Sequence, residues 1–312
     1  MTFAARVDDL VRPLVPAKRL AAVRLLVGAF ALVYLVARLP AWVSPAAPGS
    51  PFRPVGPVHL VHAPLPGWVA WIALSVALGG SIAFLVGWRF KIAAPIFAAA
   101  LLWLTSYRNS FGMIFHTENM LVLHVALLSI TDATAAYSVD ARRVERAGGG
   151  AAADARRFGF ALFLLASITT LTYVLAGIAK LRISGLHWIT GDVLRNHIAH
   201  DNARKALLGD GHSVLGGWLV RHPWIFPPFA AGSVVLELGA PLALFGKRIA
   251  RVWCLGLWAF HVGVLALMWI FFPYPLSFIA YAPFFEAERF VEWVRARASR
   301  LAQKPEPSAA LE

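Results

Sequence analysis

Long apolar stretches alternate with short polar segments along the chain. Seven of them approach or exceed the length, about 20 residues, at which an α-helix crosses the hydrocarbon of a bilayer. We predict an all-α fold, a polytopic transmembrane helical bundle of seven or eight spans, because a helix satisfies its own backbone hydrogen bonds in lipid. The predicted spans cover residues 21–43, 67–87, 90–106, 112–131, 158–179, 229–246 and 251–272.

An eighth apolar segment, 275–292, is a weaker candidate for a span. It follows the helix-breaking sequence Pro273-Tyr274-Pro275 and becomes charged at Glu286. We therefore expect either a half-span or a helix on the membrane surface.

Basic residues in the loops predict how the chain is oriented, because Lys and Arg are retained on the cytoplasmic side. The loop 132–157 holds five of them, whereas the loop 44–66 holds one. This distribution places the N-terminus inside. The predicted organisation is a cytoplasmic segment 1–19, a transmembrane domain 20–292 and a basic to disordered tail 293–312.

The connection 180–228 then lies outside the cell. It combines helix-like apolar spacing with five histidines. Its indole side chains belong to Trp188, Trp218 and Trp224. Since indole rings prefer the membrane interface, we expect this loop to be folded there.

The composition supports a membrane protein. Of 312 residues, 59% are hydrophobic and 14% are charged, whereas soluble domains carry about 25% charged residues. The net charge of +13 comes from Lys and Arg scattered through loops, without the basic stripe of a nucleic-acid site. We expect anionic membrane lipids, and no nucleic acid, as partners. The Ala- and Arg-rich usage is compatible with the cytoplasmic membrane of a bacterium.

Thiol and metal chemistry have little support in the sequence. Cys254 is the single cysteine, which excludes an intramolecular disulfide and a paired-cysteine metal site. His197 and His200 have a helical spacing that suits a metal, but no third ligand follows at a convincing interval. We predict no metal site, so redox chemistry would need a bound cofactor.

Four residues of the fifth predicted span share one helical face. Thr169, Tyr173, Gly177 and Lys180 are spaced by four, four and three. The small Gly177 leaves room for a ligand or for another backbone. Desolvation near the outer interface would favour a neutral amine on Lys180, which a general base needs. Alternatively, Lys180 reaches the headgroups and anchors the helix end.

The fourth predicted span begins with the sequence SYRNSFGMIFHTENMLVLH. His116, Met120 and His124 share one face, with Asn119 beside it, while Glu118 points away. Ionisable groups in hydrocarbon are costly, so they are candidates for function. A hydrogen-bonded polar seam between helices is the alternative.

Two further polar residues interrupt apolar helices. The buried carboxylate of Glu237 needs a partner, and we predict a structural ion pair with Arg24, Arg108 or Lys180. His261 is expected to be a hydrogen-bonded packing residue.

Four motifs, taken in order, resemble the horizontally transferred transmembrane (HTTM) family, which includes vitamin K-dependent γ-carboxylase. They are SYRNSFGMIFHTENMLVLH, TDATAAYSVDARR, YVLAGIAKL with the later W-x-x-G of Trp188–Gly191, and the FH of the seventh span. The resemblance covers residues 20 to 285. It departs from the family at Ala179-Lys180, where the carboxylase has two adjacent lysines.

The resemblance implies a membrane enzyme with a quinol cofactor such as vitamin K hydroquinone. Lys180 would be the base that deprotonates the quinol, with His116 as a second catalytic residue. O2 and CO2 would be co-substrates, and a glutamate of a secreted peptide would be carboxylated. The expected cofactor-binding residues are Asn119, Tyr173, Thr169 and His124.

Two other functions remain open from the sequence. The protein could be a non-catalytic membrane maturation or immunity factor for a secreted peptide toxin, with the outer loop binding the peptide. A small-solute transporter is a third hypothesis, but the chain has no internal repeat and no matching pair of broken helices.

Overall fold

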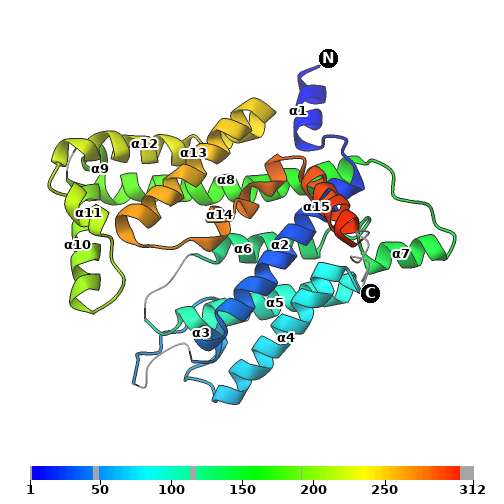
Figure 1. Cartoon of the computed structure of the whole chain (residues 1–312), viewed down its shortest axis with the longest axis horizontal. Helices are drawn as coiled ribbons and strands as arrows, with labels where there is room; N and C mark the ends of the chain where they lie inside the picture. The colour runs from blue at the N-terminus through cyan, green and yellow to red at the C-terminus, as the bar shows by residue number, and fades with distance from the viewer. Residues whose placement is uncertain (1, 45–48, 113–116, 191, 303–312) are drawn as a thin grey trace, which may run out of the picture.

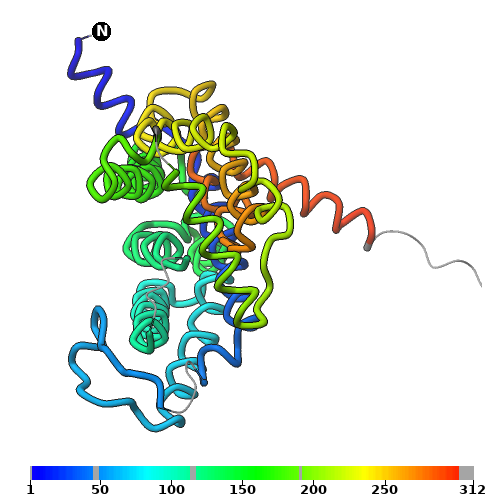
Figure 2. Tube along the Cα trace, turned by 90° about the vertical axis from the view of Figure 1, so that its left-hand side faces the viewer, coloured from blue at the N-terminus to red at the C-terminus, as the bar shows by residue number. Residues whose placement is uncertain are grey.

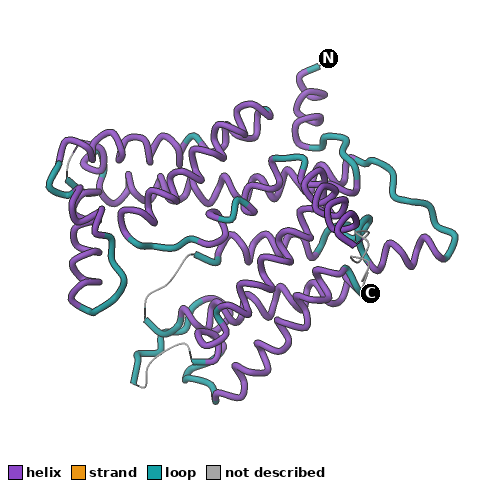
Figure 3. The backbone as a smooth tube through the Cα atoms, in the orientation of Figure 1, coloured by secondary structure: helices purple, strands orange, loops and turns teal. Residues whose placement is uncertain are grey.

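The computed structural model describes residues 2–44, 49–112, 117–190 and 192–302. Within these ranges every regular element is a helix, and strand-like pairing is limited to a bridge between Val15 and Ala155 (Figure 3). The predicted all-α fold is therefore confirmed. Five helices are long and apolar enough to cross a membrane: α2 (Ala17–Ala37), α4 (Gly67–Val86), α5 (Phe90–Asn109), α8 (Arg156–Ser184) and α13 (Lys247–Met268).

Other predicted spans are divided into shorter helices. The first continues from α2 into α3 (Leu39–Val43), with Pro40 at its start. The fourth contains α6 (Asn119–Ser129), preceded by residues outside the described ranges. The sixth is split into α12 (Phe226–Leu238) and the 3₁₀ helix η3 (Ala240–Phe245), because Pro241 removes a backbone donor just after α12 ends.

The eighth predicted segment is not one helix. The chain passes through α14 (Pro273–Leu276) and the 3₁₀ helix η4 (Ile279–Phe284) before α15 (Ala287–Ala302) begins. Tyr274 and Tyr281 are buried, so this irregular stretch lies inside the bundle, where protein groups replace water around its backbone. The helix α15 begins within the predicted segment 275–292 and continues beyond it, so the predicted tail boundary at 292 falls within a helix.

The two ends of the bundle differ in what they carry. Figure 1 shows α8 running the length of the molecule, with α12 above it, α13 crossing it obliquely, and α2, α4, α5 and α6 below. The N-terminus, α1 (Phe3–Val11), α7 (Val139–Arg146) and α15 lie at one end. The predicted outer loop lies at the other, where it forms α9 (His187–Thr190), α10 (Val193–Leu207), α11 (Val214–Leu219) and the 3₁₀ helix η2 (Pro223–Ile225). The remaining 3₁₀ helix, η1 (Gly56–Leu60), packs against α5.

The motif TDATAAYSVDARR ties helices together at the N-terminal end. Buried Arg24 donates to the carbonyls of Ala133 (3.0 Å) and Tyr137 (2.8 Å) in this motif, and to two carbonyls at the end of α4. Asp140 of the same motif accepts the first backbone N–H groups of α5 at 3.0 and 2.9 Å. A cation at a helix C-terminus and a carboxylate at a helix N-terminus both complement the helix dipole. The motif is therefore explained by helix termination and capping.

Candidate functional site

Lys180 is directed into the protein at the outer-loop end of α8. Its Nζ lies 2.5 Å from Glu237 Oε1 on α12, and the two side chains are 17% and 3% exposed. The ammonium also lies 5.1 Å from the centre of the Trp188 ring and 5.2 Å from that of Phe260. These contacts hold the amine between helices, in a carboxylate and aromatic environment.

Gly177 allows this approach of the two helices. A Cβ at this position would lie 2.9 Å from Leu238 Cδ2 and 3.1 Å from Glu237 Cβ. Side-chain atoms that close must shift, so the position favours glycine. The sequence predicted that the space beside Gly177 would admit either a ligand or another backbone. The structure shows the neighbouring helix α12 there.

Glu237 has one oxygen that is not satisfied. Oε1 accepts from Lys180, but buried Oε2 has no hydrogen-bond partner among the described residues. The prediction of an ion pair is confirmed, with Lys180 as the partner. Arg24 binds backbone carbonyls instead, and Arg108 binds Glu118 at 2.5 Å.

Thr169 and His124 belong to a buried network in the middle of the bundle. His124 Nδ1 lies 2.7 Å from the Tyr274 hydroxyl, and its Nε2 lies 3.1 Å from the carbonyl of Leu165 and 3.2 Å from Thr169 Oγ1. Thr169 also donates to the carbonyl of Ala280 at 3.1 Å. These groups join α6 and α8 to the irregular stretch after α13.

Tyr173 joins a second network, one turn along α8. Its hydroxyl lies 2.9 Å from His261 Nε2 on α13 and 2.7 Å from the Tyr281 hydroxyl. His261 is buried and hydrogen-bonded as expected. The face of α8 that carries Thr169, Tyr173 and Lys180 therefore bonds to three different elements in succession.

Two predicted site residues are not joined to these networks. His116 lies outside the described residues. Asn119 is exposed at the first position of α6. Its neighbour Glu118 is buried and accepts from Tyr34 and Arg108, both at 2.5 Å. Glu118 therefore links α2, α5 and the start of α6, away from His124 as the helical spacing predicts.

Several residues of the networks were not identified from the sequence. Their signal was weak, because an aromatic residue in an apolar segment is usually part of the core. Tyr274 lies between Pro273 and Pro275 and Tyr281 follows them, and only their hydroxyls distinguish the two residues from packing residues. The residues missed are Tyr274, Tyr281, Trp188 and Phe260.

The Lys180 site has the groups that a hydroxylated aromatic ligand would need. The orphaned Glu237 Oε2 is a hydrogen-bond acceptor without a donor among the described residues. Trp188 and Phe260 offer aromatic surface beside the amine. The hydroxyls of Thr169 and Tyr173 already form hydrogen bonds within the protein, so they are less available to bind such a ligand. Among the described residues, no three His, Cys, Asp or Glu side chains come together as a metal site.

The long apolar helices and the charged pair between them define a multi-pass membrane protein. The HTTM domain model matches residues 12–289, so the chain belongs to the HTTM family. The HTTM domain is found in vitamin K-dependent carboxylase-related proteins. Comparison with the curated proteins gave no match, and comparison with the solved structures gave none either.

Proposed function

We propose that the protein is a membrane enzyme that oxidises a quinol with O2 and modifies a peptide, by carboxylation with CO2 as in the γ-carboxylase. The observation that carries the proposal is the buried Lys180–Glu237 pair at 2.5 Å, with its second carboxylate oxygen unbonded among the described residues. Family membership supports it. We place this activity in the cytoplasmic membrane of a bacterium.

In this proposal Lys180 and Glu237 act as one proton-handling unit. A proton shared between Nζ and Oε1 can reside on the carboxylate, and the amine is then a neutral base. Oε2 would accept a hydrogen bond from a hydroxyl of the ligand and so orient that hydroxyl towards the amine. Trp188 and Phe260 exclude water from the pair, which strengthens its electrostatic interactions. A bound quinol, such as vitamin K hydroquinone, would supply the reducing equivalents and the hydroxyl proton.

The test is turnover of vitamin K hydroquinone by the purified protein in lipid nanodiscs under O2. We expect Lys180→Ala to lower the rate of quinol oxidation by about 100-fold or more, which is the range of general acid–base catalysis. Glu237→Gln keeps the shape of the site but not its charge, and should lower the rate by a smaller factor.

Lys205→Ala is the matched control. Lys205 is also paired with a carboxylate, Asp201 at 2.6 Å, and is similarly buried, but it lies on α10 in the outer loop. It should retain the wild-type rate. Equal rates for Lys180→Ala and Lys205→Ala would refute the role of Lys180, and absence of any quinol oxidation by wild-type protein would refute the enzyme itself.

The outer loop favours a second function, a maturation or immunity factor that binds a secreted peptide. A cavity of about 520 Å³ lies between α10 and α11. Beside it, Val214 and Trp218 are exposed by 80% and 54%. An apolar surface of this kind suits a peptide partner. Toxin maturation that persists in Lys180→Ala but is lost in Trp218→Ala would favour this function over the enzyme.

A further inference from the structure

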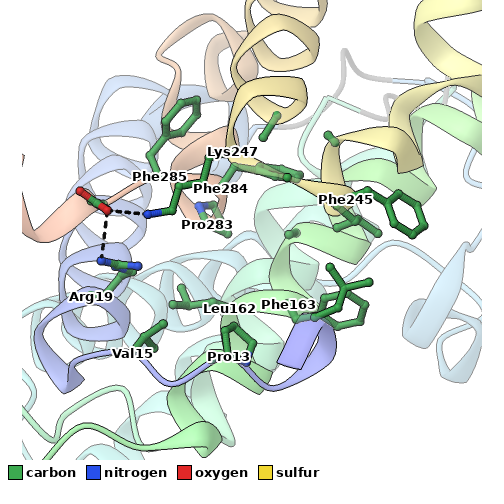
Figure 4. A pocket seen from close by; sticks show the side chains of 18 of the residues that line it. Pro13, Val15, Arg19, Leu162, Phe163, Phe245, Lys247, Pro283, Phe284 and Phe285 are labelled. Carbon is green, nitrogen blue, oxygen red and sulfur yellow. Dashed lines mark hydrogen bonds and ion pairs between the residues drawn. The ribbon is translucent and has the colours of Figure 1, made fainter. Parts of the chain in front are cut away.

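A cavity of about 520 Å³ lies at the N-terminal end of the bundle, far along α8 from Lys180. Figure 4 shows it between the start of the chain, α8, α13 and the turn that leads into α15. Its volume is in the range of small-molecule sites, about 300–1,000 Å³. No residue of the Lys180 site lines it.

The mouth of the cavity has an excess of positive charge. Two lining residues are acidic, and both are already paired: Glu286 with Lys247 at 2.9 Å, and Asp9 with Arg156 at 2.9 Å. Arg251 has no acidic partner among the described residues. Glu286 lies 2.9 Å from Lys247 and 3.8 Å from Arg19, the two labelled cations that dashed lines join to one carboxylate in Figure 4. The basic lining residues are Arg19, Lys247, Arg251 and Arg289.

The wall of the cavity is apolar and follows α8 from its N-terminal end towards the middle of the helix. Leu162, Phe163 and Ala166 form it on α8, and Phe245 of η3 faces them. Phe245 is 62% exposed, although it lies next to a span. A basic mouth that continues into an apolar wall has the two-part chemistry of a phospholipid.

The helix α15 indicates where this mouth lies relative to the bilayer. Figure 2 views the molecule along the length of α8, and α15 projects sideways from the bundle there. Phe290 and Trp293 are 54% and 57% exposed on it. A helix that lies across the spans and exposes aromatic residues beside arginines is typical of the membrane interface. The cavity therefore opens at the level of the headgroups.

We propose that this cavity binds an anionic phospholipid from the leaflet on the N-terminal side. Its phosphate lies against Arg251 and Lys247, and one acyl chain follows Leu162 and Phe163 along α8. Charge complementarity selects an anionic headgroup over a zwitterionic one. The site is independent of the proposed enzymatic function.

The test is competition between two lipids for the purified full-length protein, measured by native mass spectrometry. The protein is incubated with equal amounts of phosphatidylglycerol and phosphatidylcholine of the same acyl chains. We expect one phosphatidylglycerol to be retained preferentially by the wild type. The double variant Lys247→Gln/Arg251→Gln should lower that preference about 25-fold, because each basic residue near the phosphate contributes about fivefold.

Arg248→Gln is the matched control, since Arg248 is exposed on the same helix and does not line the cavity. It should retain the wild-type preference. Circular dichroism checks that the double variant keeps its helical content. Three results would overturn the proposal: equal retention of both lipids by the wild type, an unchanged preference in the double variant, or displacement of the lipid by millimolar inorganic phosphate.

Discussion

The Lys180–Glu237 pair allows a quantitative test of how the bundle is stabilised. Glu237→Gln leaves an uncompensated cation between helices, and Lys180→Met leaves a carboxylate whose two oxygens both lack a donor among the described residues. Breaking a buried pair from one side costs about 3–5 kcal/mol. We expect each single variant to lose about 3 kcal/mol of unfolding free energy.

The double variant isolates the interaction free energy between Lys180 and Glu237 from the effect of each single substitution. Lys180→Met/Glu237→Gln removes both charges, so neither is left buried alone. It should lose no more than either single variant, which corresponds to an interaction free energy of about 3 kcal/mol. The assay is unfolding by SDS in mixed micelles, followed by circular dichroism for all four proteins.

A control cycle on Arg12 and Asp8 calibrates the measurement. These residues are four apart at the end of α1, at 3.7 Å, and their side chains are 55% and 45% exposed. Exposed pairs of this kind contribute about 0.5 kcal/mol. Additive losses at Lys180 and Glu237, or a coupling no larger than that of the control cycle, would show that the pair does not hold α8 to α12.

Three further predictions concern packing, capping and pH. Gly177→Ala should cost about 1–3 kcal/mol in the same assay because the added methyl group displaces α12, whereas Gly263→Ala, with no atom within 4 Å of the new Cβ, should not destabilise the protein. Asp140→Ala removes the acceptor for two backbone N–H groups at the start of α5 and should cost about 1–3 kcal/mol, visible as a lower melting temperature. The hydrogen bond from Tyr137 lowers the pKa of Glu292 below its ordinary value of 4.5. A lowered carboxyl pKa stabilises the docked helix α15 above pH 4.5, and this contribution is lost as the pH falls below that value. Amide hydrogen exchange of α15 should therefore show less protection at low pH; unchanged protection in that window would contradict the assignment.

The lengths of the major helices could be predicted from the sequence, because hydrophobicity over about 20 residues reflects the thickness of the bilayer. The predicted span 67–87 corresponds to α4, Gly67–Val86. The sixth span is divided at Pro241, and the hydrophobic pattern alone did not predict that this proline ends the α-helix. The course of residues 273–284 depended on burial by other helices, which no local pattern reveals.

The candidate site was predicted only in part, for a similar reason. Helical spacing placed Thr169, Tyr173 and Lys180 on one face, and each bonds to a neighbouring element from that face. By charge alone, Arg24, Arg108 and Lys180 were equally suitable partners for Glu237. The packing of α8 against α12 selects Lys180, while Arg24 and Arg108 bind other groups. Contacts between distant segments are not encoded in the periodicity of either one.

The Lys180–Glu237 pair also constrains how the protein is made. Glu237 follows Lys180 by 57 residues, so at about 5–20 residues per second the ribosome supplies the carboxylate roughly 3 to 11 s after the amine. During that interval Lys180 lacks the counter-charge of Glu237, which favours keeping its amine in the aqueous interface. Arrival of α12 provides the counter-charge, so insertion of α8 to its final depth is coupled to synthesis of the segment beyond the outer loop.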